Sequence, residues 1–135
     1  MKYKFNDPMK IPPFEVAIVD DNALVRHATR YMLSNNNINI AFEAENGQDC
    51  IEKMQQSSQK PDIIVLDMEM PIMTGFQAAV ILKKNWPLTK IIAFSGRDDS
   101  ESIRDILAAG ADFFLSKHSE PAAFISLVRS ASGLV

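Results

Sequence analysis

Apolar residues along the chain follow two alternating patterns. Short runs rich in β-branched residues alternate with longer stretches in which apolar residues recur at helical spacing. The short runs predict five strands, at Glu15–Val19, Ile38–Ala44, Asp62–Leu66, Lys90–Phe94 and Asp112–Leu115. The longer stretches predict five helices, at Asn22–Ser34, Asn46–Ser57, Gly75–Asn85, Asp99–Ala109 and Glu120–Ala131.

Residues at the segment ends predict where the helices begin and stop. Asn46 and Ser119 have side chains that can cap the helices after them, and Pro121 suits the first turn of the last helix. Pro87 ends the third helix, because proline has no amide hydrogen and its ring clashes with the preceding turn. Gly110 ends the fourth helix at a position where a left-handed backbone is needed.

Two of the predicted strands are apolar throughout. Residues 63–66 are Ile-Ile-Val-Leu and residues 91–94 are Ile-Ile-Ala-Phe, with no polar alternation. Strands buried on both faces have this composition, which is typical of a parallel sheet covered by helices on both sides. The pattern therefore predicts a doubly wound α/β domain with a five-stranded parallel sheet.

Composition and charge narrow the possible functions. The chain has 135 residues, enough for one domain with a core, and its 47% hydrophobic and 23% charged residues are ordinary for a soluble globular protein. A net charge of −3 gives no indication of direct nucleic-acid binding. No apolar run approaches membrane-spanning length and the N-terminus lacks an apolar signal segment, which predicts a cytoplasmic protein without membrane contact.

Two local features complete the predicted layout. Residues 1–14 are expected to form an N-terminal tail, since prolines at positions 8, 12 and 13 interrupt regular structure, and residues 15–135 form the domain. The single Cys50 has no partner for an internal disulfide. It lies in an amphipathic stretch, which favours a buried and inert thiol.

Polar side chains stand at the carboxyl ends of four of the five predicted strands. The first strand leads into Asp20 and Asp21, the third into Asp67, the fourth into Ser95 and the fifth into Lys117. In open α/β sheets, ligands bind outside the carboxyl ends of the strands, near the point where the strand order reverses. In the strand order 2-1-3-4-5, the first and third strands are neighbours at that point, so three carboxylates are expected to meet beside a hydroxyl and an ammonium group.

Each of these side chains also has a plainer interpretation. Asp20 or Asp21 can cap the helix that follows them. Asp67 can be a solvated loop carboxylate, Ser95 a turn residue and Lys117 a surface cation. Three adjacent carboxylates, however, repel one another and raise each other's pKa unless a cation neutralises them. Oxygen ligands of this kind suit Mg²⁺, which favours one or two carboxylates, waters and a phosphate oxygen.

Four motifs carry a resemblance to a known family. They are Val-Asp-Asp-Asn at 19–22, Asp-Met-Glu-Met-Pro-Ile-Met-Thr-Gly at 67–75, Ser-Gly at 95–96 and Gly-Ala-Asp-Phe-Phe-Leu-Ser-Lys at 110–117. In this order and spacing they resemble the CheY-like receiver domains of response regulators in two-component signalling, over residues 15–131. The resemblance implies a flavodoxin-like sheet of five parallel strands in the order 2-1-3-4-5. The motif Asp-x-x-x-Pro-x-x-x-Gly after an apolar strand is by itself moderately specific for this family. Together with the acidic pair before it, and Ser95 and Lys117 after it, it makes a strong match.

The resemblance implies a role for each residue at the strand ends. Asp67 would accept a phosphoryl group from a histidine kinase or a phosphotransfer protein and form an aspartyl phosphate. The ligands of Mg²⁺ would be the carboxylates of Asp20, Asp21 and Asp67 and the backbone carbonyl of Glu69. Lys117 would place a positive charge on another phosphoryl oxygen. The chain would then be a phosphoacceptor switch that catalyses only its own phosphoryl transfer and dephosphorylation.

Two residues match the switch positions of the family. Ser95 would bond to a phosphoryl oxygen and move inward, and Phe114 would turn inward with it. The surface affected comprises residues 99–109, 112–116 and 120–131. An effector protein, an output domain or a second copy of the chain would bind there. The alternative for Phe114 is a plain core aromatic residue.

The chain departs from the family pattern at a few positions. His118 stands where the family usually has proline, and Pro121 follows three positions later, as in receivers that precede LuxR-type helix-turn-helix output domains. The chain is therefore expected to be either a single-domain regulator or part of a longer protein. Glu69 and Arg97 each stand two residues beyond a site residue, at variable positions that resemble those that tune the lifetime of the phosphoryl group in the family. These two side chains can pair across the mouth of the site, although an exposed pair contributes little.

Three other classes of protein are disfavoured. A haloacid-dehalogenase-type phosphatase has a second acid in Asp-x-Asp, whereas this chain has Glu69 two residues after Asp67. A nucleotide-binding module has a glycine-rich phosphate loop, which this sequence lacks. A degenerate receiver has lost an acidic residue or the lysine, and this chain retains all of them.

Overall fold

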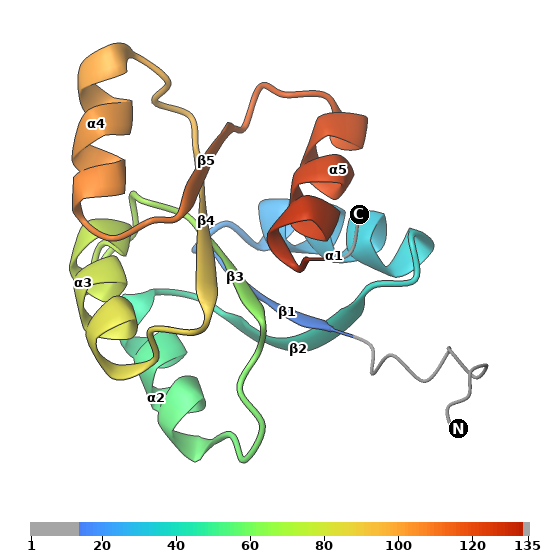
Figure 1. The fold of residues 1–135 in the computed structure, drawn as a ribbon, viewed down its shortest axis with the longest axis horizontal. Helices are drawn as coiled ribbons and strands as arrows, with labels where there is room; N and C mark the ends of the chain where they lie inside the picture. The colour runs from blue at the N-terminus through green and yellow to red at the C-terminus, as the bar shows by residue number, and fades with distance from the viewer. Residues whose placement is uncertain (1–13, 134–135) are drawn as a thin grey trace.

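Five parallel strands form one sheet in the order β2-β1-β3-β4-β5 (Figure 1). The computed structural model describes residues 14–133. The strands are β1 (Glu15–Val19), β2 (Asn39–Ala44), β3 (Ile63–Leu66), β4 (Lys90–Ser95) and β5 (Phe113–Ser116). The predicted doubly wound α/β fold and its strand order are confirmed.

Helices cover both faces of this sheet. They are α1 (Ala23–Asn35), α2 (Gly47–Gln56), α3 (Gly75–Asn85), α4 (Ser100–Ala108) and α5 (Pro121–Ala131). In Figure 1, α1 and α5 lie on one side of the sheet, and α2, α3 and α4 lie on the other. Each strand is therefore followed by a helix that returns the chain to the amino end of the sheet, as parallel pairing requires.

Side chains of the strands alternate between two apolar cores. Ile64 and Leu66 of β3 lie in the core under α2, α3 and α4, whereas Ile63 and Val65 lie in the core under α1 and α5. All four are buried, as predicted for a strand in the middle of a parallel sheet. Burial of each such aliphatic side chain stabilises the fold by roughly 1.5–3 kcal/mol, so the middle of the sheet is a rigid base for the residues at its ends.

Local capping explains where two of the helices begin. Asn46 caps α2 as predicted, since its side chain accepts a hydrogen bond from the Asp49 amide at 2.8 Å. The predicted cap at Ser119 is wrong, because the N-cap of α5 is Glu120, whose side chain makes no capping hydrogen bond. A residue before proline avoids helical geometry, so Glu120 stays extended and the helix starts at Pro121.

The helix ends follow the predicted breakers. α3 ends two residues before Pro87. After α4 the chain passes through Gly110 with a φ of +124°, a backbone conformation that other residues rarely adopt. β2 begins one residue later than predicted, because Asn37 has a φ of +60° and the Ile38 amide still donates to the Leu33 carbonyl of α1.

Three further sequence predictions concern the tail, the cysteine and the membrane. Of residues 1–14 the structure describes only Phe14, which packs against the core under α1 and α5, so the predicted tail otherwise lies outside the described residues. Cys50 is buried as predicted, and burial raises the pKa of its thiol to about 12. Between residues 14 and 133, no helix is long and apolar enough to cross a membrane.

Candidate functional site

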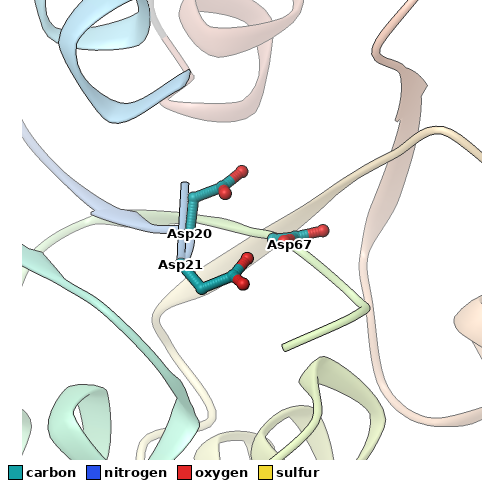
Figure 2. A group of neighbouring side chains, drawn as sticks. All are labelled: Asp20, Asp21 and Asp67. Carbon is teal, nitrogen blue, oxygen red and sulfur yellow. The ribbon is translucent and has the colours of Figure 1, made fainter. Parts of the chain in front are cut away.

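Three carboxylates meet at the carboxyl ends of two adjacent strands. Asp20 and Asp21 directly follow β1, and Asp67 directly follows β3. The strands pair with Val19 opposite Leu66, so the residues after them emerge side by side. One oxygen of each carboxylate lies within 4.8 Å of the others. Figure 2 shows the three side chains extending toward a common space.

Lys117 supplies the positive charge of this cluster. It follows β5, and its backbone amide donates to the Ser95 carbonyl at 2.8 Å. Its Nζ lies 2.9 Å from Asp20 Oδ2 and 3.2 Å from Asp67 Oδ1. Asp20 and Asp67 are only 3% and 6% exposed, whereas Asp21 is exposed. The ammonium group thus bridges the two buried carboxylates, and Asp21 faces solvent.

Burial and charge set the protonation of the site. Burial and the Asp20 carboxylate raise the pKa of Asp67 to about 6, against the lowering effects of Lys117 and the Glu69 amide. Burial lowers the pKa of Lys117, but its hydrogen bond to Asp20 and the charge of Asp67 outweigh burial, and the net shift is upward. Near neutral pH, Asp67 is therefore mostly ionised and faces a charged ammonium group.

The loop after Asp67 depends on Gly75. A Cβ atom at Gly75 would lie 2.2 Å from the Asp67 backbone oxygen and 2.5 Å from Met68 Cα. Only glycine permits this approach, which explains the last residue of the Asp-x-x-x-Pro-x-x-x-Gly motif. The Gly75 amide donates to the Met68 carbonyl at 3.1 Å, and the Glu69 amide donates to Asp67 Oδ1 at 3.3 Å. These bonds hold the Asp67 carboxylate in place.

Ser95 and Phe114 lie on adjacent strands. Ser95 ends β4, is 2% exposed, and its Oγ accepts a hydrogen bond from the Arg97 amide at 3.1 Å. Phe114 pairs with Ala93 in the β4–β5 register, two residues before the partner of Ser95. The Phe114 ring is partly buried and packs against the core under α2, α3 and α4. The structure therefore places Phe114 on the strand next to Ser95, against the core under α2, α3 and α4.

Comparison with known proteins now identifies the family. A family model for the response regulator receiver domain matches residues 16–129. The chain belongs to this family. The chemotaxis protein CheY of Thermotoga maritima is 32% identical over 117 residues, which cover 87% of this receiver and 96% of that protein. The transcriptional regulatory protein YxjL of Bacillus subtilis is 34% identical over 118 residues, and this receiver spans only 53% of its length.

Solved structures of receivers share the fold. The signal receiver domain of the response regulator NarL from Mycobacterium tuberculosis has a TM-score of 0.81 at 27% identity, covering 90% of this chain and 97% of that one. The CheX–CheY–BeF₃–Mg²⁺ complex from Borrelia burgdorferi includes a chain with a TM-score of 0.82 at 26% identity, with 87% and 88% covered. A receiver is a signalling domain, and the relatives of this one include chemotaxis proteins and transcriptional regulators.

Two variable positions of the receiver form an ion pair. Glu69 Oε2 lies 2.5 Å from Arg97 Nε, so these side chains do pair, as their positions in the sequence permit. Glu69 is 55% exposed and Arg97 is 65% exposed. A pair this exposed adds little to stability, and its effect is to join the loops that follow β3 and β4.

His118 provides a hydrogen bond that the usual proline cannot make. Its backbone amide donates to Ser116 Oγ at 3.0 Å, and the Ser116 hydroxyl donates to Asp98 Oδ2 at 3.2 Å. Proline has no amide hydrogen to donate. The Ser116 hydroxyl therefore links the His118 amide, just after β5, to Asp98 in the loop after β4.

Two residues next to the acidic pair have roles that were not predicted from the sequence. Asn22 caps α1, since its side chain accepts bonds from two amides of the first turn, so capping by Asp20 or Asp21 is wrong. Arg26 Nη1 donates to the Asp20 backbone carbonyl at 2.7 Å, and its Nε lies 3.7 Å from Glu43. A basic residue one turn into the helix after the acidic pair is the signal that points to Arg26.

The donor set of the site fits a divalent cation. Within residues 14–133, the ion pairs of the three carboxylates involve only the Lys117 ammonium group, which leaves an excess of negative charge. Carboxylate oxygens are ligands that Mg²⁺ prefers, and the exposure of Asp21 leaves room for the waters that complete its coordination. The residues present therefore suit a bound Mg²⁺.

Proposed function

We propose that Asp67 accepts a phosphoryl group from the phosphohistidine of a histidine kinase or a phosphotransfer protein. The observation that carries this proposal is the place of Asp67, which is buried in the acidic cluster with Lys117 Nζ at 3.2 Å. Asp67 Oδ1 accepts the bonds from Lys117 and the Glu69 amide, which leaves Oδ2 to attack phosphorus. A P–O bond forms as the P–N bond to the donor imidazole breaks.

Asp20, Asp21 and Asp67, with the backbone carbonyl of Glu69, would hold Mg²⁺ in this proposal. The bound cation would neutralise charge on the transferring phosphoryl group. Lys117 would contact another phosphoryl oxygen, since its Nζ already lies next to the attacking carboxylate. The Borrelia burgdorferi complex that contains CheY, BeF₃ and Mg²⁺ supports this assignment.

Ser95 and Phe114 would connect the site to the surface of the receiver. Ser95 Oγ accepts a hydrogen bond from the Arg97 amide, so the Ser95 hydroxyl hydrogen is available to donate to a phosphoryl oxygen. Inward movement of this hydroxyl would vacate space for the Phe114 ring, which packs only partly into the core. The face made by α4, β5 and α5 would then have two states, whose populations the phosphoryl group changes. Glu69 and Arg97 would set the access of water and hence the phosphoryl lifetime.

This α4-β5-α5 face would bind an effector protein, an output domain or a second copy of the chain. Longer relatives support an output domain, since the receiver spans 53% of YxjL and 52% of DegU from Brevibacillus brevis, both transcriptional regulatory proteins. The domain would comprise residues 15–135 and catalyse only its own phosphoryl transfer and dephosphorylation. A cytoplasmic location without direct nucleic-acid or membrane contact stays a prediction.

Asp67→Asn tests the assignment of the nucleophile. Acetyl phosphate with Mg²⁺ should label the wild type with an acid-labile, hydroxylamine-sensitive phosphoryl group and leave Asp67→Asn unlabelled, with circular dichroism unchanged. Asp105→Asn is the matched control, because Asp105 is an exposed aspartate on α4 and should be labelled like the wild type. Stoichiometric labelling of Asp67→Asn at another carboxylate would overturn the assignment.

A further inference from the structure

Ile72 has a backbone conformation that isoleucine rarely adopts. Its φ is +71°, and the Met73 amide donates to the Pro71 carbonyl at 2.8 Å across it. A hydrogen bond between the residues on either side of a positive φ forms a γ-turn of the rare and strained kind. A β-branched residue increases the strain, because its two γ carbons crowd the backbone.

The neighbours of Ile72 keep the strained turn in place. The Gly47 amide of α2 donates to the Met73 carbonyl at 3.2 Å, and the Gly75 amide donates to the Met68 carbonyl at 3.1 Å. A Cβ atom on Gly47 would lie 2.7 Å from Met73 Cγ, so α2 and the loop already pack as closely as glycine allows. The loop therefore cannot relax around residue 72 without breaking these contacts.

Packing within the chain does not account for an isoleucine at this position. The Ile72 side chain is 82% exposed, so its hydrophobic surface contributes little to folding. Glycine would fit the same turn without strain. A strained residue with an exposed apolar side chain is expected to serve a contact outside the chain.

The surface beside Ile72 is acidic. Ile72 borders a polar hollow of about 370 Å³ between the loop and α2, lined also by Glu45, Asn46, Gln48, Asp49, Glu52 and Lys53. Lys53 pairs with Asp49 at 3.2 Å, and the other two carboxylates have no cation among the residues that line the hollow. A partner that covers this surface therefore needs an apolar recess for Ile72 and basic side chains around it.

We propose that Ile72 is a docking anchor for the phosphodonor protein, which receives it in an apolar recess with a basic rim. This inference rests on the proposed function of Asp67. Asp67 lies at the start of the same loop and is only 6% exposed, so a protein that delivers a phosphohistidine to Asp67 is expected to contact this loop. A few side chains that fill pockets near the centre of such a contact contribute most of its affinity.

Two substitutions separate the side chain from the strain. Ile72→Ala removes the apolar side chain and keeps a Cβ at positive φ, whereas Ile72→Gly removes both. Leu88→Ala is the matched control, because Leu88 is 91% exposed and lies between α3 and β4, at the opposite end of the strands. The phosphodonor is chosen first. Purified histidine kinase cores and phosphotransfer domains are phosphorylated and ranked by the rate at which they transfer the phosphoryl group to the wild type. The fastest donor is then used as the probe.

Both Ile72 variants should accept phosphoryl from this probe about tenfold more slowly than the wild type. Labelling by acetyl phosphate should stay within about twofold, because that small donor needs no docking. Leu88→Ala should match the wild type with both donors. Ile72→Gly should melt at a higher temperature than Ile72→Ala, since glycine relieves the strain.

Three results would overturn the docking role. The first is transfer from the probe at the wild-type rate in both Ile72 variants, and the second is an equal loss in Leu88→Ala. The third is that acetyl phosphate labels Asp67 of the wild type, but none of the phosphorylated kinase cores and phosphotransfer domains does. Failure of acetyl phosphate to label Asp67 would instead disprove the proposed function, and the inference with it. An Ile72→Gly variant no more stable than Ile72→Ala would remove the strain argument.

Discussion

Arg26 of α1 donates a hydrogen bond of 2.7 Å to the backbone carbonyl of Asp20. The carbonyl belongs to the peptide that joins Asp20 to Asp21, so Arg26 holds the backbone between the two acidic residues. Glu43 of β2 holds the guanidinium from the other side at 3.7 Å and also pairs with Arg30 at 2.6 Å. The acidic pair is therefore braced by a helix and by the neighbouring strand.

Arg26→Ala is expected to lower the free energy of unfolding by about 1–2 kcal/mol, because it removes a charged and partly buried hydrogen bond. It should also weaken Mg²⁺ binding, since Asp20 and Asp21 lose their brace. Arg30→Ala is the control, because Arg30 pairs with Glu43 without touching Asp20. Calorimetric Mg²⁺ titration and urea unfolding measure the two effects. Equal Mg²⁺ affinity in Arg26→Ala and Arg30→Ala would contradict the bracing role.

Stability should depend on pH through Asp67. Its pKa is raised from 3.8 to about 6, so the folded state binds the proton more tightly than the unfolded chain. The stabilising contribution of the protonated group is fully present below about pH 4 and is lost as the pH rises through about 6. Without Mg²⁺, the wild type should therefore lose about 1–3 kcal/mol relative to Asp67→Asn between pH 4 and pH 7.

Urea unfolding of both proteins in EDTA at several pH values measures this difference. Asp67→Asn serves as the reference because its amide does not titrate, so the other groups cancel in the comparison. A difference that stays constant, or that increases in favour of the wild type toward neutral pH, would show that burial and the Asp20 charge do not control Asp67.

Mg²⁺ should stabilise the receiver by linkage. At a concentration of ten times its dissociation constant, a cation that binds only the folded state adds about 1.4 kcal/mol. Asp21→Ala removes the exposed carboxylate of the cluster and should reduce this gain, whereas Asp105→Asn on α4 should leave it unchanged. Thermal unfolding with and without Mg²⁺ measures the gain. An undiminished shift in Asp21→Ala would place the cation elsewhere.

Phe114→Ala should separate phosphorylation from the change at the surface. In the wild type, beryllofluoride with Mg²⁺ should shift amide NMR signals of residues 96–100 and 112–117 far more than those of residues 38–57. Removal of the ring leaves nothing to fill the space behind Ser95, so the shifts at 112–117 should diminish while acetyl phosphate labelling persists. Phe113→Ala is the control, since Phe113 packs into the opposite core. Unchanged shifts in Phe114→Ala would disprove the switch.

The apolar segments show how much of the fold follows from local sequence. Ile63–Leu66 is buried on both faces, as its unbroken run of β-branched and aliphatic residues predicts. The helix stop at Pro87 and the positive φ at Gly110 follow from single residues whose backbone chemistry leaves few choices. Ser119 shows the limit, because proline two residues later moved the start of α5.

The sequence by itself determined the order of strands and helices along the chain and the burial of the apolar strands. It also determined that acidic residues follow the first and third strands. These depend on residue type and spacing within short segments. Only the tertiary structure decided that Lys117 bonds to Asp20, 97 residues away, and that Arg26 braces the Asp20 carbonyl. It also decided the backbone conformation of Ile72, whose positive φ is a value that isoleucine disfavours. Hydrogen bonds from Gly47 of α2 and from Gly75 hold the loop that contains Ile72 in this conformation. Such contacts depend on how helices and strands pack against one another, and a pattern within a short segment does not predict that packing.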